Sequence, residues 1–108
     1  MKMKNRKEEV MTAHERIAAR NIREAFNFEI GGMYNAYLDG EDGEFPTIEE
    51  AKEMVYDCAI NDLYGYGSCC VGAAPREMRF AGKEFCMKYI DKLFANDPDV
   101  AAIPWAER

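Results

Sequence analysis

Six carboxylates lie within the twelve residues 39-DGEDGEFPTIEE-50, a density that raises the possibility of a calcium loop. An EF-hand loop needs oxygen ligands at positions one, three and five, a glycine at six and a glutamate at twelve. Counted from Asp39, position five is Gly43 and position six is Glu44, so both requirements fail. The stretch is a poor calcium loop, and we predict neither a metal nor a cofactor.

Ordinary turn and capping chemistry explains the two ends of this stretch. Asp-Gly pairs at 39–40 and 42–43 are typical of turns. Thr47 followed by Glu50 predicts a capping box, in which each side chain accepts from the backbone amide of the other residue. A helix is therefore expected to begin at Thr47, with Glu49, Glu50 and Glu53 near the positive end of its dipole.

The amount of charge exceeds what turns and caps require. Residues 29–62 hold ten acids and one base, Lys52, whereas the whole chain has a net charge of −6. Residues 1–24 show the opposite bias, with seven bases and four acids. Acids that serve only solubility need no such segregation, but a concentrated negative field steers a positive partner.

We therefore expect a surface that binds the basic cleft of a nucleic-acid-binding protein, with carboxylates in the place of phosphates. Tyrosines next to the glycine-rich segment could add contacts, because aromatic rings attract guanidinium groups. The predicted partner-binding residues are Asp39, Glu41, Asp42, Glu44, Glu49, Glu50, Glu53, Asp57, Tyr64 and Tyr66.

Motifs for catalysis are lacking in the sequence. His14 and Glu15 are neighbours, which point about 100° apart on a helix, so His14 is expected to be a lone surface histidine. Ser68 is not in a nucleophile elbow, and Gly65-x-Gly67 lacks the third glycine of a dinucleotide site. We predict that the protein is not an enzyme.

The four cysteines favour structural thiols. Cys58 and Cys86 fall on apolar helix faces, where free cysteine behaves as a small hydrophobe. Cys69 and Cys70 are adjacent in a glycine-rich segment, closer together than paired zinc ligands usually are. Whether that pair is structural, redox-active or metal-binding stays open.

A basic first helix supports an alternative function. Arg16, Arg20 and Arg23, together with four bases before residue 8, could contact phosphates in a small nucleic-acid-associated regulator. The sequence pI of about 4.8 makes direct nucleic-acid binding the weaker hypothesis. Because basic side chains oppose the dipole at a helix start, we expect acids from elsewhere in the fold to anchor these arginines.

Three helices must position these residues. Apolar spacings of three, four and seven predict a first helix over about 7–30, which ends at Gly31-Gly32, after which MYNAYL can resume as a short helix. The second helix follows Thr47 and ends near Tyr64. The third runs from Pro75 to about Ala95, and its Gly82 is expected where another backbone comes close.

The expected fold is mainly α, a single domain over 1–108 of three or four helices. An ordered glycine-rich loop should join helices two and three, residues 1–6 should be flexible, and 97-DP-98 should start a further short turn.

Several sequence features predict the cellular location and the type of the protein. No apolar run is long enough to span a membrane, and the basic start leads into charged residues, so a cytoplasmic protein is expected. Self-association into a homodimer stays open. In its small size, acidity and helical pattern the chain resembles phage and mobile-element proteins that block host nucleases, such as anti-CRISPR and antirestriction proteins. That resemblance is one of type, with no matched motif.

Overall fold

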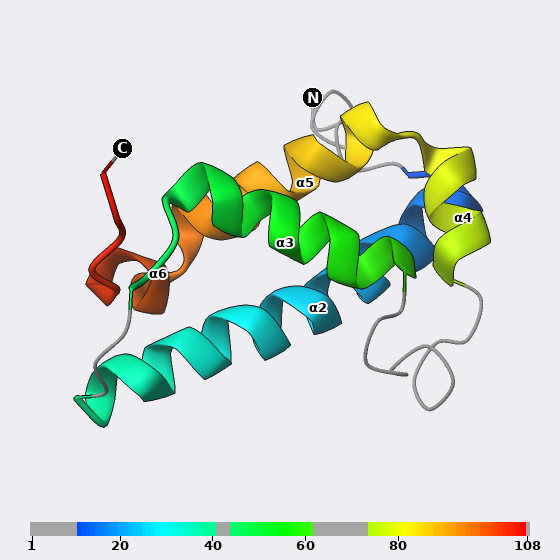
Figure 1. Cartoon of the computed structure of the whole chain (residues 1–108). Coiled ribbons are helices and arrows are strands. Elements are labelled where there is room, and N and C mark those ends of the chain that lie inside the picture. Colours follow the sequence, from blue (N-terminus) through cyan, green and yellow to red (C-terminus); the bar gives the residue numbers. More distant parts are fainter. Residues whose placement is uncertain (1–10, 41–43, 62–73, 108) are drawn as a thin grey trace, which may run out of the picture.

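The structure is a computed structural model that describes residues 11–40, 44–61 and 74–107. The described part is mainly α, as predicted, with five helices (Figure 1). They are α2 (Ala13–Leu38), α3 (Ile48–Asn61), α4 (Ala74–Ala81), α5 (Lys83–Asn96) and α6 (Pro98–Ala102). The predicted glycine-rich loop and flexible start lie outside the described residues.

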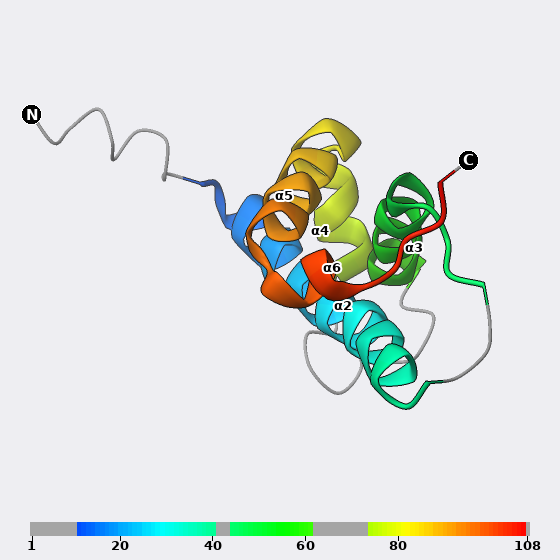
Figure 2. The same ribbon diagram turned by 90° about the vertical axis from the view of Figure 1, so that its left-hand side faces the viewer.

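The long helix α2 forms the base of the fold. It contacts each of the other four described helices. Figures 1 and 2 show α3 and α5 side by side along the same side of α2, with α4 near the N-terminal end of α2 and α6 beside its C-terminal half. The outer side of α2 is therefore left to solvent along much of its length.

The predicted end of the first helix at Gly31-Gly32 is wrong. α2 starts at Thr12, whose side chain forms a capping box with Glu15, and it continues through both glycines to Leu38. A glycine inside a helix costs about 1 kcal/mol relative to alanine. Met33 and Tyr34 pack against the core just beyond the glycines, and this burial offsets the cost.

The predicted capping box of α3 is confirmed. The Thr47 amide donates to a Glu50 carboxylate oxygen at 2.9 Å, and the Glu50 amide donates to the Thr47 hydroxyl at 3.1 Å. The box satisfies two backbone amides that would otherwise lack partners at the helix start. It fixes the residue at which α3 begins.

The predicted third helix is two helices, α4 and α5, that meet at Gly82. The φ angle of Gly82 is 94°, a backbone conformation that other residues rarely adopt. Among the described residues, a Cβ atom at Gly82 would meet nothing within 4 Å, so the expected close approach of a second backbone is not found there. Glycine allows the change of direction between the two helices.

One hydrophobic core joins all five described helices. α2 contributes Ile22, Phe26 and Ile30, and most of the apolar stripe predicted for this helix is buried. Ile90, which the sequence analysis did not name, is fully buried in α5, where it lies four residues from each of the buried Cys86 and Phe94 on one face of the helix. The expected burial of Cys58 and Cys86 is confirmed.

The C-terminal segment closes the end of the core. Asp97 caps α6 through its side chain, as the Asp-Pro pair predicted. The Trp105 indole donates to the Val100 carbonyl at 2.8 Å, and the Ala106 amide donates to the Pro46 carbonyl at 3.0 Å. The bond to Val100 lies within the C-terminal segment, and the bond to Pro46 holds this segment against the start of α3.

Candidate partner-binding surface

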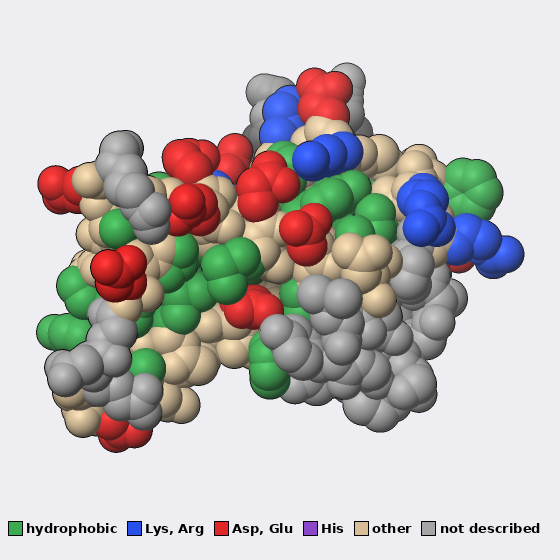
Figure 3. All heavy atoms as spheres, viewed as in Figure 1, with side chains coloured by type: hydrophobic (Ala, Val, Ile, Leu, Met, Phe, Trp, Pro, Cys, Tyr) green, Lys and Arg blue, Asp and Glu red, His purple; other side chains and the backbone are tan. Residues whose placement is uncertain are grey.

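Three carboxylates form a ridge on the outer side of α3. Glu49, Glu53 and Asp57 are spaced four residues apart, which places them on one face of the helix, and all three are exposed. We call these three residues the acidic ridge. Figure 3 shows acidic side chains gathered over α3 and the neighbouring part of α5, whereas Lys and Arg side chains on that face lie mainly toward α4.

The buried side of α3 fixes the direction of the ridge. Ala51, Val55, Cys58 and Ala59 are almost fully buried. Rotation of the helix about its axis would expose them and bury carboxylates, which is costly without partners. The apolar stripe, rather than any contact between acids, therefore holds the ridge outward.

Two lysines hold the ridge from its flanks. The Lys52 ammonium lies 3.1 Å from Asp91 of α5 and 3.9 Å from Glu49, and its side chain is mostly buried over the Phe94 ring. Lys83 lies 3.6 Å from Glu53, above the Tyr56 ring. Ion pairs whose carboxylates are exposed, as they are here, contribute about 0.2–1 kcal/mol each, so they orient the side chains more than they stabilise the fold.

Within the described part of the chain, Asp57 has no ion pair. The ridge with Asp91 holds four carboxylates, of which Lys52 and Lys83 offset two charges. Met54, which is exposed on the same helix, adds an apolar side chain to this region. The surface is therefore net negative and has an apolar element, a combination that suits a protein partner.

The remaining predicted site residues are distributed differently. Glu44 and Glu50 are exposed next to the start of α3, and Glu50 also serves the capping box. Asp39 is the exposed C-cap of α2, and Figures 1 and 2 show that end of α2 well apart from α3. The residues Glu41, Asp42, Tyr64 and Tyr66 lie outside the described residues.

The arginines of α2 do not neutralise the ridge. Arg16 donates to the Met11 carbonyl at 2.8 Å, and Arg23 donates to the Tyr89 hydroxyl. In the segments that the structure describes, no carboxylate forms an ion pair with Arg16, Arg20 or Arg23. The expectation that acids anchor these arginines is therefore wrong for this part of the chain.

His14 is not the lone surface histidine that the sequence suggested. Its Nδ1 lies within hydrogen-bonding distance of a carboxylate oxygen of Glu77, which is buried on α4, and its ring lies 4.8 Å from that of Phe80. The hydrogen bond to His14, aided by Arg76, holds the pKa of Glu77 below its usual value of 4.5, although burial opposes this shift. Sequence reasoning missed the pair because the two residues lie 63 positions apart.

The described residues include no group of three or more His, Cys, Asp or Glu side chains that could hold a metal ion. Burial raises the pKa of the Cys86 thiol to about 11, so this thiol is protonated at neutral pH and is a poor nucleophile. Cys69 and Cys70, like the centre of the acidic stretch, lie outside the described residues.

None of the helices that the structure describes has the length and apolar character needed to cross a membrane. No protein-family model, no curated protein and no solved structure matches this chain. The acidic ridge therefore has to be interpreted from its own chemistry.

Proposed function

We propose that the protein binds other proteins through the acidic ridge and inhibits or regulates a nucleic-acid-binding partner by occupying its basic cleft. The observation that carries the proposal is the ridge itself, three exposed carboxylates on one face of α3 with none of the arginines of α2 paired to them. Along a helix, carboxylates four residues apart are spaced by about 6 Å. A regular row of negative charge can thus lie where a phosphate backbone otherwise would.

Electrostatics suits such a function in two respects. Carboxylates in water attract a cationic cleft before contact, which raises the association rate. Lys52 and Lys83 hold ridge side chains in place, so less side-chain entropy is lost on binding. Partners of this type include nucleases, and inhibition of a host-defence nuclease in the manner of anti-CRISPR or antirestriction proteins belongs to this proposal.

The test uses purified nucleases and nucleic-acid-binding proteins, whose affinity for this protein is measured across a salt series. Glu49→Lys with Asp57→Lys is compared with Glu84→Lys with Glu107→Lys. The two variants change the net charge equally, and Glu49 and Glu84 are both at the second position of their helices.

The ridge variant should lose binding, while the control should keep it within about twofold. Binding should weaken as salt rises, and an oligonucleotide should compete for the partner. Equal losses in the two variants, or binding that ignores both salt and oligonucleotide, would contradict the proposal.

A further inference from the structure

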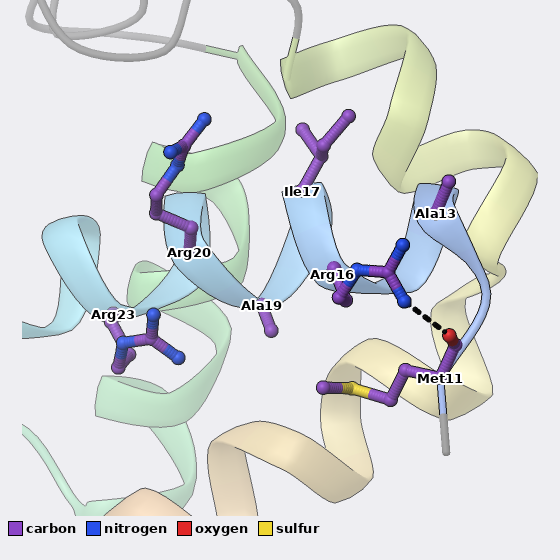
Figure 4. A pocket seen from close by; sticks show the side chains of 7 residues that line it. All are labelled: Met11, Ala13, Arg16, Ile17, Ala19, Arg20 and Arg23. Atoms are coloured by element: carbon purple, nitrogen blue, oxygen red, sulfur yellow. Dashed lines mark hydrogen bonds between the residues drawn. The ribbon is translucent and has the colours of Figure 1, made fainter.

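A hollow of about 450 Å³ lies along the first turns of α2, on residues that the acidic ridge does not use. Its lining includes the three arginines of α2 and four apolar residues, namely Met11, Ala13, Arg16, Ile17, Ala19, Arg20 and Arg23. Figure 4 shows the arginines on successive turns of the helix, with the Arg16 guanidinium bonded to the Met11 carbonyl. We call this feature the arginine hollow.

Two of the guanidiniums are held in position, and no carboxylate of the described residues neutralises them. Arg16 is bound by the carbonyl of Met11, and Arg23 by the hydroxyl of Tyr89, and both acceptors are uncharged. Arg20 has no ion pair among the described residues. Guanidiniums that are oriented and still carry full charge are suited to anions, because little side-chain entropy remains to be lost on binding.

The fold does not need this charge. Arg16 lies in the first turn or two of α2, where a cation opposes the helix dipole, and a neutral polar residue would remove that penalty. A second hollow of about 280 Å³ shares Arg23 and adds Lys92 and Tyr89, with Asp97 as the one carboxylate of its described lining against these two cations. The positive region therefore continues from α2 toward α5.

We propose that the arginine hollow binds a small molecule that carries two or more phosphoryl groups. Arginine pairs with phosphate through parallel hydrogen bonds, and three arginines that leave α2 within about 10 Å along its axis match several charges better than one carboxylate. The volume lies in the range of small-ligand sites, and Ile17 and Met11 supply apolar contact. The net charge of the whole chain is −6, so a long polyanion bound at the hollow would also be repelled by the rest of the molecule. A small ligand therefore fits better than a nucleic-acid chain.

The experiment titrates tripolyphosphate, pyrophosphate and orthophosphate into the full chain by calorimetry at low ionic strength. Arg16→Gln with Arg20→Gln is compared with Arg76→Gln with Arg79→Gln, which removes the same charge from exposed arginines of α4. Circular dichroism establishes that both variants remain helical. A single-stranded oligonucleotide forms a further arm of the titration.

Tripolyphosphate should bind more tightly than orthophosphate, and the hollow variant should lose about tenfold in affinity for each guanidinium removed. The α4 control should bind within about threefold of the unmodified protein. Equal binding by the two variants, no binding of tripolyphosphate, or binding of the oligonucleotide alone would each overturn the proposal.

This inference does not depend on the acidic ridge. The ridge variant Glu49→Lys with Asp57→Lys should keep its affinity for tripolyphosphate. A gain in tripolyphosphate affinity in that variant as large as the loss in the hollow variant would show general electrostatics instead of a site, and would also overturn the proposal.

Discussion

The acidic ridge of α3 and the arginine hollow of α2 place charges of opposite sign near the start of a helix. On α3 the first-turn acids agree with the helix dipole, and Lys52 and Lys83 neutralise part of the row. On α2 an early arginine opposes the dipole, and neutral acceptors hold two of the three guanidiniums. The carboxylates of the ridge therefore cost little folding free energy. The arginines of the hollow include a charge that lowers the stability of the helix, and this points to a ligand.

Both surfaces depend on the same core beneath them. Ile22 is fully buried on the inner side of α2, while Arg20 is exposed on its outer side. Ile22→Ala should lower the free energy of unfolding by about 2–5 kcal/mol through a cavity and lost burial. Arg20→Gln should change it by no more than about 0.5 kcal/mol. Urea unfolding followed by circular dichroism measures both, and a similar cost for the two would show that the arginine has a structural role.

One buried side chain joins the helix of the hollow to the helix of the ridge. The Asn21 amide of α2 donates to the Ala59 carbonyl of α3 at 2.6 Å, and a weaker contact at 3.6 Å reaches the Met78 sulfur. Asn21→Ala should cost about 1–3 kcal/mol, because a buried carbonyl loses a donor. Asn27→Ala, at an exposed position of the same helix, is the control and should be near neutral in the same unfolding experiment.

The two helices start with the same capping chemistry, so their caps can be compared directly. Thr12→Ala and Thr47→Ala should each lower stability by about 1 kcal/mol. Thr47→Ala should also increase amide hydrogen exchange at the start of α3 while leaving α2 unchanged. Exchange that rises equally in both helices would show that the ridge is not fixed by its own cap.

A buried carboxylate provides a contrast to the exposed ridge. The pKa of Glu77 is held below 4.5 chiefly by the hydrogen bond to His14, so the pair stabilises the fold at neutral pH. That contribution is lost as the pH falls below about 4.5 through the lower pKa of the folded state. In His14→Gln the pKa of Glu77 should rise, and unfolding free energies should fall less steeply over this acid range.

Carbon-13 spectra of the Glu77 carboxyl give the pKa change directly, and urea unfolding at several pH values gives the stability. An unchanged Glu77 pKa in His14→Gln would contradict the assigned cause.

The smallest expected effects have opposite signs on the two helices. Glu49→Gln should lower stability and Arg16→Gln should raise it, each by about 0.3–1 kcal/mol at low salt, as the dipole predicts. Both differences should shrink in 0.5–1 M salt, where charges are screened within a few ångströms. Thermal unfolding at two salt concentrations measures them, and equal signs would remove the electrostatic distinction between the surfaces.

The sequence predicted those parts of the structure that local chemistry determines. Thr47 and Glu50 located the start of α3, and the apolar stripe of α3 determined which of its acids face outward. The prediction that the first helix ends at Gly31-Gly32 was wrong, because the packing of Met33 and Tyr34 outweighs the low helix propensity of glycine. Gly82 suggested that a second backbone comes close, but in the structure this glycine has a positive φ angle at the junction of α4 and α5.

Contacts between distant residues could not be predicted in this way. The pairing of His14 with Glu77, and of Lys52 with Asp91, depends on how the helices pack, and no local pattern encodes it. The arginine stripe was visible in the sequence, whereas the neutral acceptors of Arg16 and Arg23 were not. Those acceptors make the arginines a candidate anion site instead of part of a salt-bridge network.

The most direct test of the acidic ridge as the partner-binding surface is a nitrogen-15 NMR titration of the full chain with an arginine-rich peptide. Amide shifts should be largest along α3 at Glu49, Glu53 and Asp57, should saturate, and should be lost in Glu49→Lys with Asp57→Lys but kept in Glu84→Lys with Glu107→Lys. Shifts spread evenly over the acids of the whole chain, with the same loss in both variants, would contradict a dedicated surface.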